Sequence, residues 1–193
     1  MNQRENALAA RICHDLITPF NALNLGLEAL EISGDTSLLK EIRGSVNKAG
    51  AVLKFMRELY SEKSDAFCYS LKSLTQTVTD FAEKYGISFK LRSDLENIPH
   101  IAGKIVMHNA ITAKEIMPFG GFVDIKIDDV SGEIVMTCDG KNVALPNIDA
   151  GRTEANSRNI MTVAWLELLE TAGFKATTCR EEEKVRVCQR MTV

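Results

Sequence analysis

Residues 9–19 read AARICHDLITP, and they lie inside an apolar pattern that repeats at the helical period. The apolar side chains of one predicted helix face are Leu8, Ile12, Leu16, Phe20, Leu23, Leu27 and Leu30. His14 is placed roughly 160° around the helix from Leu16. Its imidazole is therefore expected to face water.

The expected outer face around His14 carries small or polar side chains and one leucine: Ala7, Arg11, Thr18, Asn21 and Leu25. Such a surface suits a protein that brings its histidine to the active site of another protein. Pro19 removes one helical hydrogen bond and is expected to kink the helix just past this site. If the helix bends there, Leu25 belongs to a dimer core rather than to a docking surface.

Two long helices are predicted to form a hairpin over residues 1–64. Gly34 and Asp35 end the first helix at Ser33, and a second helix begins near Thr36. Its apolar residues follow a heptad pattern: Leu39, Ile42, Val46, Ala49, Leu53, Met56 and Tyr60. Because two helices alone bury little, the hairpin must dock on the rest of the chain or on a second hairpin from a partner subunit. The length of the seam favours the second option, a dimeric four-helix bundle.

Residues 65–193 change period and predict a compact α/β layer domain. The expected strands are 66–70, 87–92, 122–128, 133–138, 174–179 and 184–191, and the expected helices are 71–85, 100–117 and 157–172. The chain as a whole is thus predicted to be α+β, with an N-terminal helical hairpin and a C-terminal α/β sandwich.

Composition excludes several classes of function. The 23 basic and 26 acidic residues are scattered, so no basic stripe for nucleic acid is present. No apolar stretch reaches the roughly 20 residues of a membrane span, and a charged amphipathic helix follows the N-terminus. The five cysteines form no C-x-x-C pair, which favours reduced thiols and argues against a zinc cluster. We expect a cytoplasmic protein that binds neither nucleic acid nor membrane.

The run HDLITP, residues 14–19, resembles the phosphoacceptor box of sensor histidine kinases. The second half resembles the ATP-binding (Bergerat) domain of these kinases. There, residues 107–114 with Pro118 and Gly120-Gly121 look like the Asn box, and Asp139-Gly140 lies where the first glycine-rich box begins.

The chain departs from the kinases where nucleotide is bound. Ile105 stands where kinases usually have a second Asn, and it cannot hold Mg²⁺. Asp139-Gly140 lacks the next glycine of its box, and no Gly-x-Gly follows before Arg158 to cradle a phosphate. An acceptor box joined to a degenerate ATP-binding domain in a chain this short is similar to the ChpT-type histidine phosphotransferases.

This resemblance implies a homodimer in which His14 accepts a phosphoryl group from the receiver Asp of a hybrid histidine kinase and passes it to a response regulator. Asp15 is expected to orient the imidazole and Thr18 to bind a phosphoryl oxygen or position water. Arg11, Asn21 and Leu25 are expected to contact the receiver.

No cofactor or metal is expected on the chain itself, because the receiver supplies Mg²⁺. Two alternatives stay open, a minimal ATP-dependent histidine kinase and a non-catalytic adaptor that binds receivers.

Overall fold

Two antiparallel helices open the computed structural model, which describes residues 3–64, 66–147, 156, 159–181 and 184–191. Helix α1 spans Gln3–Ser33 and continues through Pro19, and helix α2 spans Leu39–Tyr60. Between them Gly34 adopts a positive φ of 67°, and Asp35 accepts a hydrogen bond of 2.9 Å from the Ser37 backbone N–H. This bond caps the short 3₁₀ turn η1 (Thr36–Leu38), so the hairpin closes where the sequence predicts.

The heptad seam of α2 is divided between two environments. Ile42, Ala49 and Met56 are buried, whereas the seam residues that alternate with them (Leu39, Val46 and Leu53) are each about half exposed. At Gly26 of α1, an added Cβ would lie 2.8 Å from Cγ1 of Ile42, so glycine allows the two helices to approach closely. A single chain therefore leaves part of the predicted seam uncovered.

An α/β sandwich follows the hairpin. Its elements are β1 (Cys68–Ser70), α3 (Leu71–Ala82), the 3₁₀ turn η2 (Glu83–Tyr85), β2 (Ile87–Arg92), β3 (Asn97–Pro99), α4 (His100–Ile116), β4 (Gly121–Ile127), β5 (Ile134–Asp139), α5 (Ile160–Thr171), β6 (Phe174–Glu181) and β7 (Lys184–Met191). Five strands form one sheet in the order β2-β4-β5-β7-β6, in which only β2 and β4 are parallel. Strands β1 and β3 form a separate antiparallel pair.

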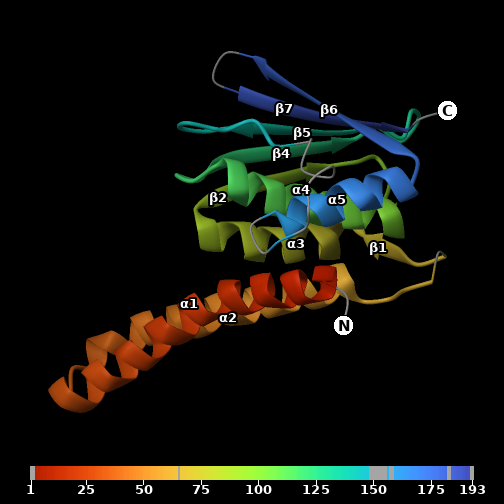
Figure 1. The fold of residues 1–193 in the computed structure, drawn as a ribbon. Coiled ribbons are helices and arrows are strands. Elements are labelled where there is room, and N and C mark those ends of the chain that lie inside the picture. The colour runs from red at the N-terminus through yellow and green to blue at the C-terminus, as the bar shows by residue number, and fades with distance from the viewer. Residues whose placement is uncertain (1–2, 65, 148–155, 157–158, 182–183, 192–193) are drawn as a thin grey trace.

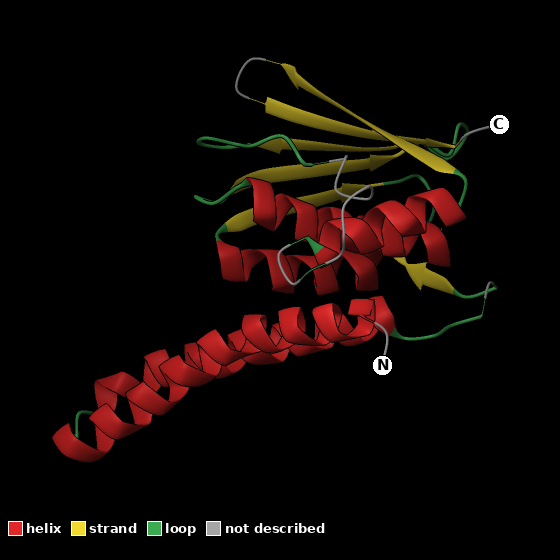
Figure 2. Cartoon of the chain, in the orientation of Figure 1, coloured by secondary structure: helices red, strands yellow, loops and turns green. Residues whose placement is uncertain are grey.

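The molecule has three layers. Helices α3, α4 and α5 cover one face of the five-stranded sheet, and the hairpin lies on the far side of these helices (Figures 1 and 2). The closed end of the hairpin extends well beyond the sandwich (Figure 1). Phe55 of α2 stacks on Phe81 of α3 with ring centroids 4.0 Å apart, and both side chains are fully buried. The hairpin and the sandwich consequently share one hydrophobic core.

The predicted fold class is confirmed, with a small correction in the order of elements. The sequence analysis missed β3, because a three-residue strand that contains a proline gives no readable alternation. Helix α2 ends at Tyr60, the last residue of the predicted seam, and α5 begins at Ile160. Residues 157 and 158, the expected start of that last helix, lie outside the described residues.

No helix in the described part of the chain is both long enough and apolar enough to cross a membrane.

Candidate functional site

His14 and Asp15 are neighbours in α1 but lie in opposite environments. The side chain of His14 is 76% exposed, whereas that of Asp15 is only 8% exposed. Successive helical residues are rotated by about 100°, and this rotation turns Asp15 from the solvent side towards α4. The exposed imidazole predicted from the helical pattern is confirmed.

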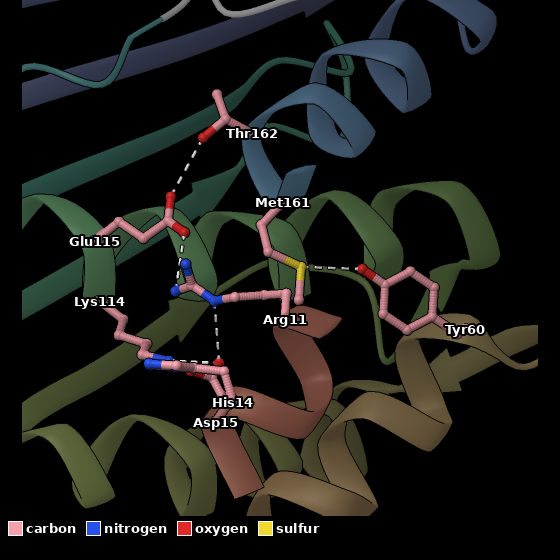
Figure 3. A network of polar contacts seen from close by, with 8 residues as sticks. All are labelled: Arg11, His14, Asp15, Tyr60, Lys114, Glu115, Met161 and Thr162. Atoms are coloured by element: carbon pink, nitrogen blue, oxygen red, sulfur yellow. Dashed lines mark hydrogen bonds and ion pairs between the residues drawn. The ribbon is translucent and has the colours of Figure 1, made fainter. Parts of the chain in front are cut away.

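The two carboxylate oxygens of Asp15 contact different groups (Figure 3). Lys114 of α4 donates a hydrogen bond of 2.7 Å from Nζ to Oδ2, and Nε of Arg11 lies 3.5 Å from the same oxygen. The other oxygen, Oδ1, lies 3.6 Å from Nδ1 of His14. Asp15 therefore connects two cations on its buried side to the exposed imidazole.

Arg11 extends this arrangement to a second carboxylate. A terminal nitrogen of its guanidinium lies 3.3 Å from Oε1 of Glu115, and the Thr162 hydroxyl of α5 donates to Oε2 of Glu115 at 3.2 Å. We call Arg11, Asp15, Lys114 and Glu115 the charge cluster. Its two cations and two anions join α1 to α4, and Thr162 adds α5.

Burial and pairing act in opposite directions on the protonation of the charge cluster. Burial raises the pKa of Asp15, but the hydrogen bond and charge of Lys114 and the charge of Arg11 outweigh it, so the pKa lies below its ordinary value. Burial lowers the pKa of Lys114 more than its bond to Asp15 raises it. Burial also raises the pKa of Glu115, against the charge of Arg11. Because the pKa of Asp15 is lowered, its side chain is a carboxylate at neutral pH and accepts the hydrogen bond from Lys114.

Aromatic contacts hold the hairpin against the sandwich beside this cluster. Nζ of Lys114 lies 4.4 Å from the ring centroid of Tyr85, and Nζ of Lys48 from α2 lies 5.1 Å from the same centroid. The Tyr60 hydroxyl of α2 lies 3.2 Å from the sulfur of Met161 in α5 (Figure 3). Lys48 and Tyr60 thereby join α2 to the sandwich, as the bond between Asp15 and Lys114 joins α1 to it.

The structure brings Thr18, the predicted phosphoryl contact, and two of the predicted receiver contacts, Asn21 and Leu25, to the surface of α1 with His14. Thr18, Asn21 and Leu25 are exposed, and the exposed fraction of Leu25 is 66%. Ile17, three residues after His14, is 57% exposed and was missed, although its helical position placed it at the border of this surface. These side chains form a continuous outer face that runs from His14 towards the closed end of the hairpin.

Arg11 and Ala7 are not on this outer face, which corrects the expectation. The side chain of Arg11 is 17% exposed and points to Asp15 and Glu115, and Ala7 is buried. The first turns of α1 pack against α5, and Arg4 pairs there with Glu167. The helical period of α1 alone cannot show that α5 covers part of its surface.

The described residues do not fit bound ATP with Mg²⁺. Ile105 is fully buried in the core, and the Asp139 carboxylate lies 3.0 Å from Nζ of Lys184. Gly140 serves a close approach of backbones, because an added Cβ would lie 2.7 Å from the carbonyl oxygen of Gly120. The segment 148–155, which would hold a phosphate-binding loop, lies outside the described residues.

A cavity of about 470 Å³ lies between α4 and the chain after β5, where the kinase resemblance would place nucleotide. Arg11, Glu115 and Thr162 contribute to its wall. The ion pair of Arg11 with Glu115 therefore lies at the wall of this cavity.

The hairpin and sandwich define the class of fold found in histidine kinases and phosphotransferases. The chain superposes on a bacterial phosphotransferase with a TM-score of 0.85 and 21% identity, over 97% of this chain and 95% of that one. It also aligns with the histidine kinase AdeS of Acinetobacter baumannii at a TM-score of 0.51 and 13% identity, over 93% and 97% of the two chains. These likenesses concern the fold.

In sequence, the chain is similar to the protein phosphotransferase ChpT of Brucella abortus. The two are 27% identical over 179 residues, which cover 87% of this chain and 86% of that protein. No protein-family model matches the chain. Sequence and fold together support the predicted class, a ChpT-type protein phosphotransferase.

Proposed function

We propose that this chain is a histidine phosphotransferase of a two-component phosphorelay. His14 accepts a phosphoryl group from the receiver Asp of a hybrid histidine kinase and passes it to the receiver Asp of a response regulator in the cytoplasm. The observation that carries this proposal is the 76% exposed imidazole of His14 beside the buried, paired carboxylate of Asp15. A nucleophile on an open helix face can reach the active site of another protein.

The chemistry demands little of the chain itself. A lone pair of the imidazole attacks phosphorus, the bond from phosphorus to the receiver carboxylate oxygen breaks, and its electron pair stays on that carboxylate. In the second transfer a carboxylate oxygen of the response regulator attacks, and the bond from phosphorus to nitrogen breaks. The receiver brings Mg²⁺ in both steps, and no cofactor is proposed on the chain.

Exposed apolar residues of the hairpin support the homodimer that belongs to this proposal. Leu39, Val46 and Leu53 of α2 and Phe20 and Leu27 of α1 are 41–50% exposed in the single chain. Two such hairpins cover one another when they associate as a four-helix bundle. We assign this bundle and the acceptor site to residues 1–64, and the degenerate ATPase-like domain to residues 65–193.

The outer face of α1 supports a role for Asn21 and Leu25 in the receiver contact, and we add Ile17. Thr18, one turn after His14 on the same face, is the group proposed to bind a phosphoryl oxygen or position water. An exposed leucine and isoleucine among small polar residues offer the apolar centre and polar rim that protein interfaces use. Arg11 contributes through Asp15, since its side chain is turned to the sandwich.

The two alternatives are less well supported. An ATP-dependent kinase requires a nucleotide site, which Ile105 and the Arg11–Glu115 ion pair do not suit. A non-catalytic adaptor has no use for an exposed imidazole beside a paired carboxylate.

A relay with two purified receiver domains tests the proposal. The donor receiver is phosphorylated and freed of its kinase, and the labelled phosphoryl group is followed through this chain to the acceptor receiver. We expect wild-type chain to carry label to the acceptor and His14→Ala to carry none. Label that reaches the acceptor equally well through His14→Ala would rule out the proposed route.

A further inference from the structure

Lys114 belongs to the sandwich, yet its ammonium group lies against the acceptor box. Its Nζ is 2.7 Å from Oδ2 of Asp15, and the two side chains are 14% and 8% exposed. The sequence of the acceptor box, residues 14–19, does not indicate a contact with a lysine of α4. This contact is therefore a contribution of the sandwich to the surroundings of His14.

The geometry points to a definite role for this contact. Lys114 and Arg11 both approach Oδ2 of Asp15, so the carboxylate is fixed with Oδ1 towards Nδ1 of His14 at 3.6 Å. A small rotation of the exposed imidazole converts this separation into a hydrogen bond. With Nδ1 turned to Asp15, the other ring nitrogen, Nε2, lies on the side of the ring away from α4.

We propose that Lys114 is a positioning residue for phosphoryl transfer: it holds Asp15 so that the carboxylate accepts the Nδ1–H of His14 and Nε2 is left outward as the nucleophile. This inference rests on the function proposed above. In the transfer step, Nε2 bonds to phosphorus while the aspartyl oxygen of the receiver departs with its electron pair. The ring becomes a phosphoimidazolium, whose Nδ1 proton stays in contact with Asp15.

Few charged groups surround Asp15, so the loss of one lysine changes how its carboxylate is held. The groups that face it are Arg11 on its own helix, Lys114 and Glu115 on α4, and Tyr85 on η2 beneath Lys114. If Lys114 is removed, Oδ2 of Asp15 keeps only the longer contact to Arg11, and the carboxylate can rotate. His14 then loses the group that selects its tautomer.

The test compares lysine substitutions within one helix. Lys114→Met removes the charge, Lys114→Arg keeps it, and Lys104→Met is the matched control on the same helix. We expect Lys114→Met to lower the transfer rate at saturating phosphorylated receiver by about 10- to 100-fold, as loss of a supporting partner typically does. The half-saturating receiver concentration should stay the same, Lys114→Arg should recover most of the rate, and Lys104→Met should match wild type.

A mutant cycle separates positioning from mere stabilisation. If Lys114 acts through Asp15, Lys114→Met causes no further loss in an Asp15→Asn background. Equal rates for wild type and Lys114→Met, or independent losses in the cycle, would overturn the proposal. Lys114→Gln, which removes the charge and whose amide ends one bond short of the lysine Nζ, is measured in the same way and is decisive if Lys114→Met does not fold.

A measurement without any partner keeps this inference separate from the proposed function. The ¹⁵N chemical shifts of the imidazole report which ring nitrogen carries the proton, and His14→Ala assigns the signal among three histidines. We expect the neutral ring of wild type to carry its proton on Nδ1, and the Nε2–H form to gain in Lys114→Gln. The same tautomer in both proteins would contradict the positioning role, whereas a wild-type chain that accepts no phosphoryl group would contradict the proposed function.

Discussion

Nζ of Lys114 lies 2.7 Å from Oδ2 of Asp15, although the two residues are 99 positions apart in the sequence. This ion pair ties the acceptor helix to the sandwich one residue away from an imidazole that faces solvent. The site is thus rigid on its buried side and open on the other.

His14→Ala is expected to change stability very little. The side chain is 76% exposed and its nearest charged contact is the 3.6 Å approach to Asp15. Substitutions at such surface positions usually change the free energy of unfolding by no more than about 0.5 kcal/mol. Urea unfolding of both proteins measures this difference, and a loss of several kcal/mol would show that His14 has a structural role.

Asp15→Asn is expected to destabilise the protein by about 3 kcal/mol at pH 7, because it leaves Lys114 buried beside an uncharged amide. The folded-state pKa of Asp15 lies below its unfolded value, so the stabilisation is present above the unfolded pKa of about 4 and is lost as pH falls through the folded value. Urea unfolding from pH 7 to pH 3 should show the difference between variant and wild type shrinking. A constant difference over that range would contradict an ionised Asp15.

Leu53→Asp and Leu25→Asp form a matched pair on the hairpin, one on each helix. Leu53 belongs to the half-exposed seam of α2, and each leucine buried in a dimer contributes about 2 kcal/mol. Because the dimer carries this substitution twice, Leu53→Asp should raise the dissociation constant of the dimer by about 1,000-fold. Sedimentation should show monomers for this variant. A wild-type chain that is monomeric at micromolar concentration would contradict the proposed bundle.

Leu25→Asp should instead leave the dimer intact and weaken receiver binding. The side chain is 66% exposed on the outer face that carries His14. A charge there opposes an apolar contact without disturbing the core. Titration with a receiver domain measures the loss, and a monomeric Leu25→Asp would assign this leucine to the dimer core instead.

The sequence predicted the fold well because its strongest signals are periodic. The stripe of α1, the heptads of α2 and the turn at Gly34 and Asp35 each depend on local spacing, and the structure has them where they were expected. β3 was missed because Asn97–Pro99 is too short for any period to be visible.

The site was predicted only in part, for a physical reason. The exposure of His14 follows from one helix alone, whereas the positions of Arg11 and Asp15 depend on α4 and α5. Lys114 was recognised as part of an Asn-box pattern, but nothing in its neighbours indicates a partner at residue 15. Contacts between distant segments are set by packing, which leaves no local pattern in the sequence.

ATP is expected not to bind at useful affinity. Ile105 is buried, and Arg11 and Glu115 pair at the wall of the cavity beside α4. Calorimetry with ATP and Mg²⁺ should show no saturable heat. Saturable binding, together with label from ATP on His14 in the absence of a partner, would favour the kinase alternative.

The central claim is that His14 takes a phosphoryl group directly from a receiver domain. The most direct measurement incubates the chain with a receiver labelled on its aspartate, without kinase or ATP, and maps the modified residue by mass spectrometry. We expect an acid-labile, base-stable phosphoryl group on His14 and no label on His14→Ala. Label at another residue, or undiminished labelling of His14→Ala, would contradict it.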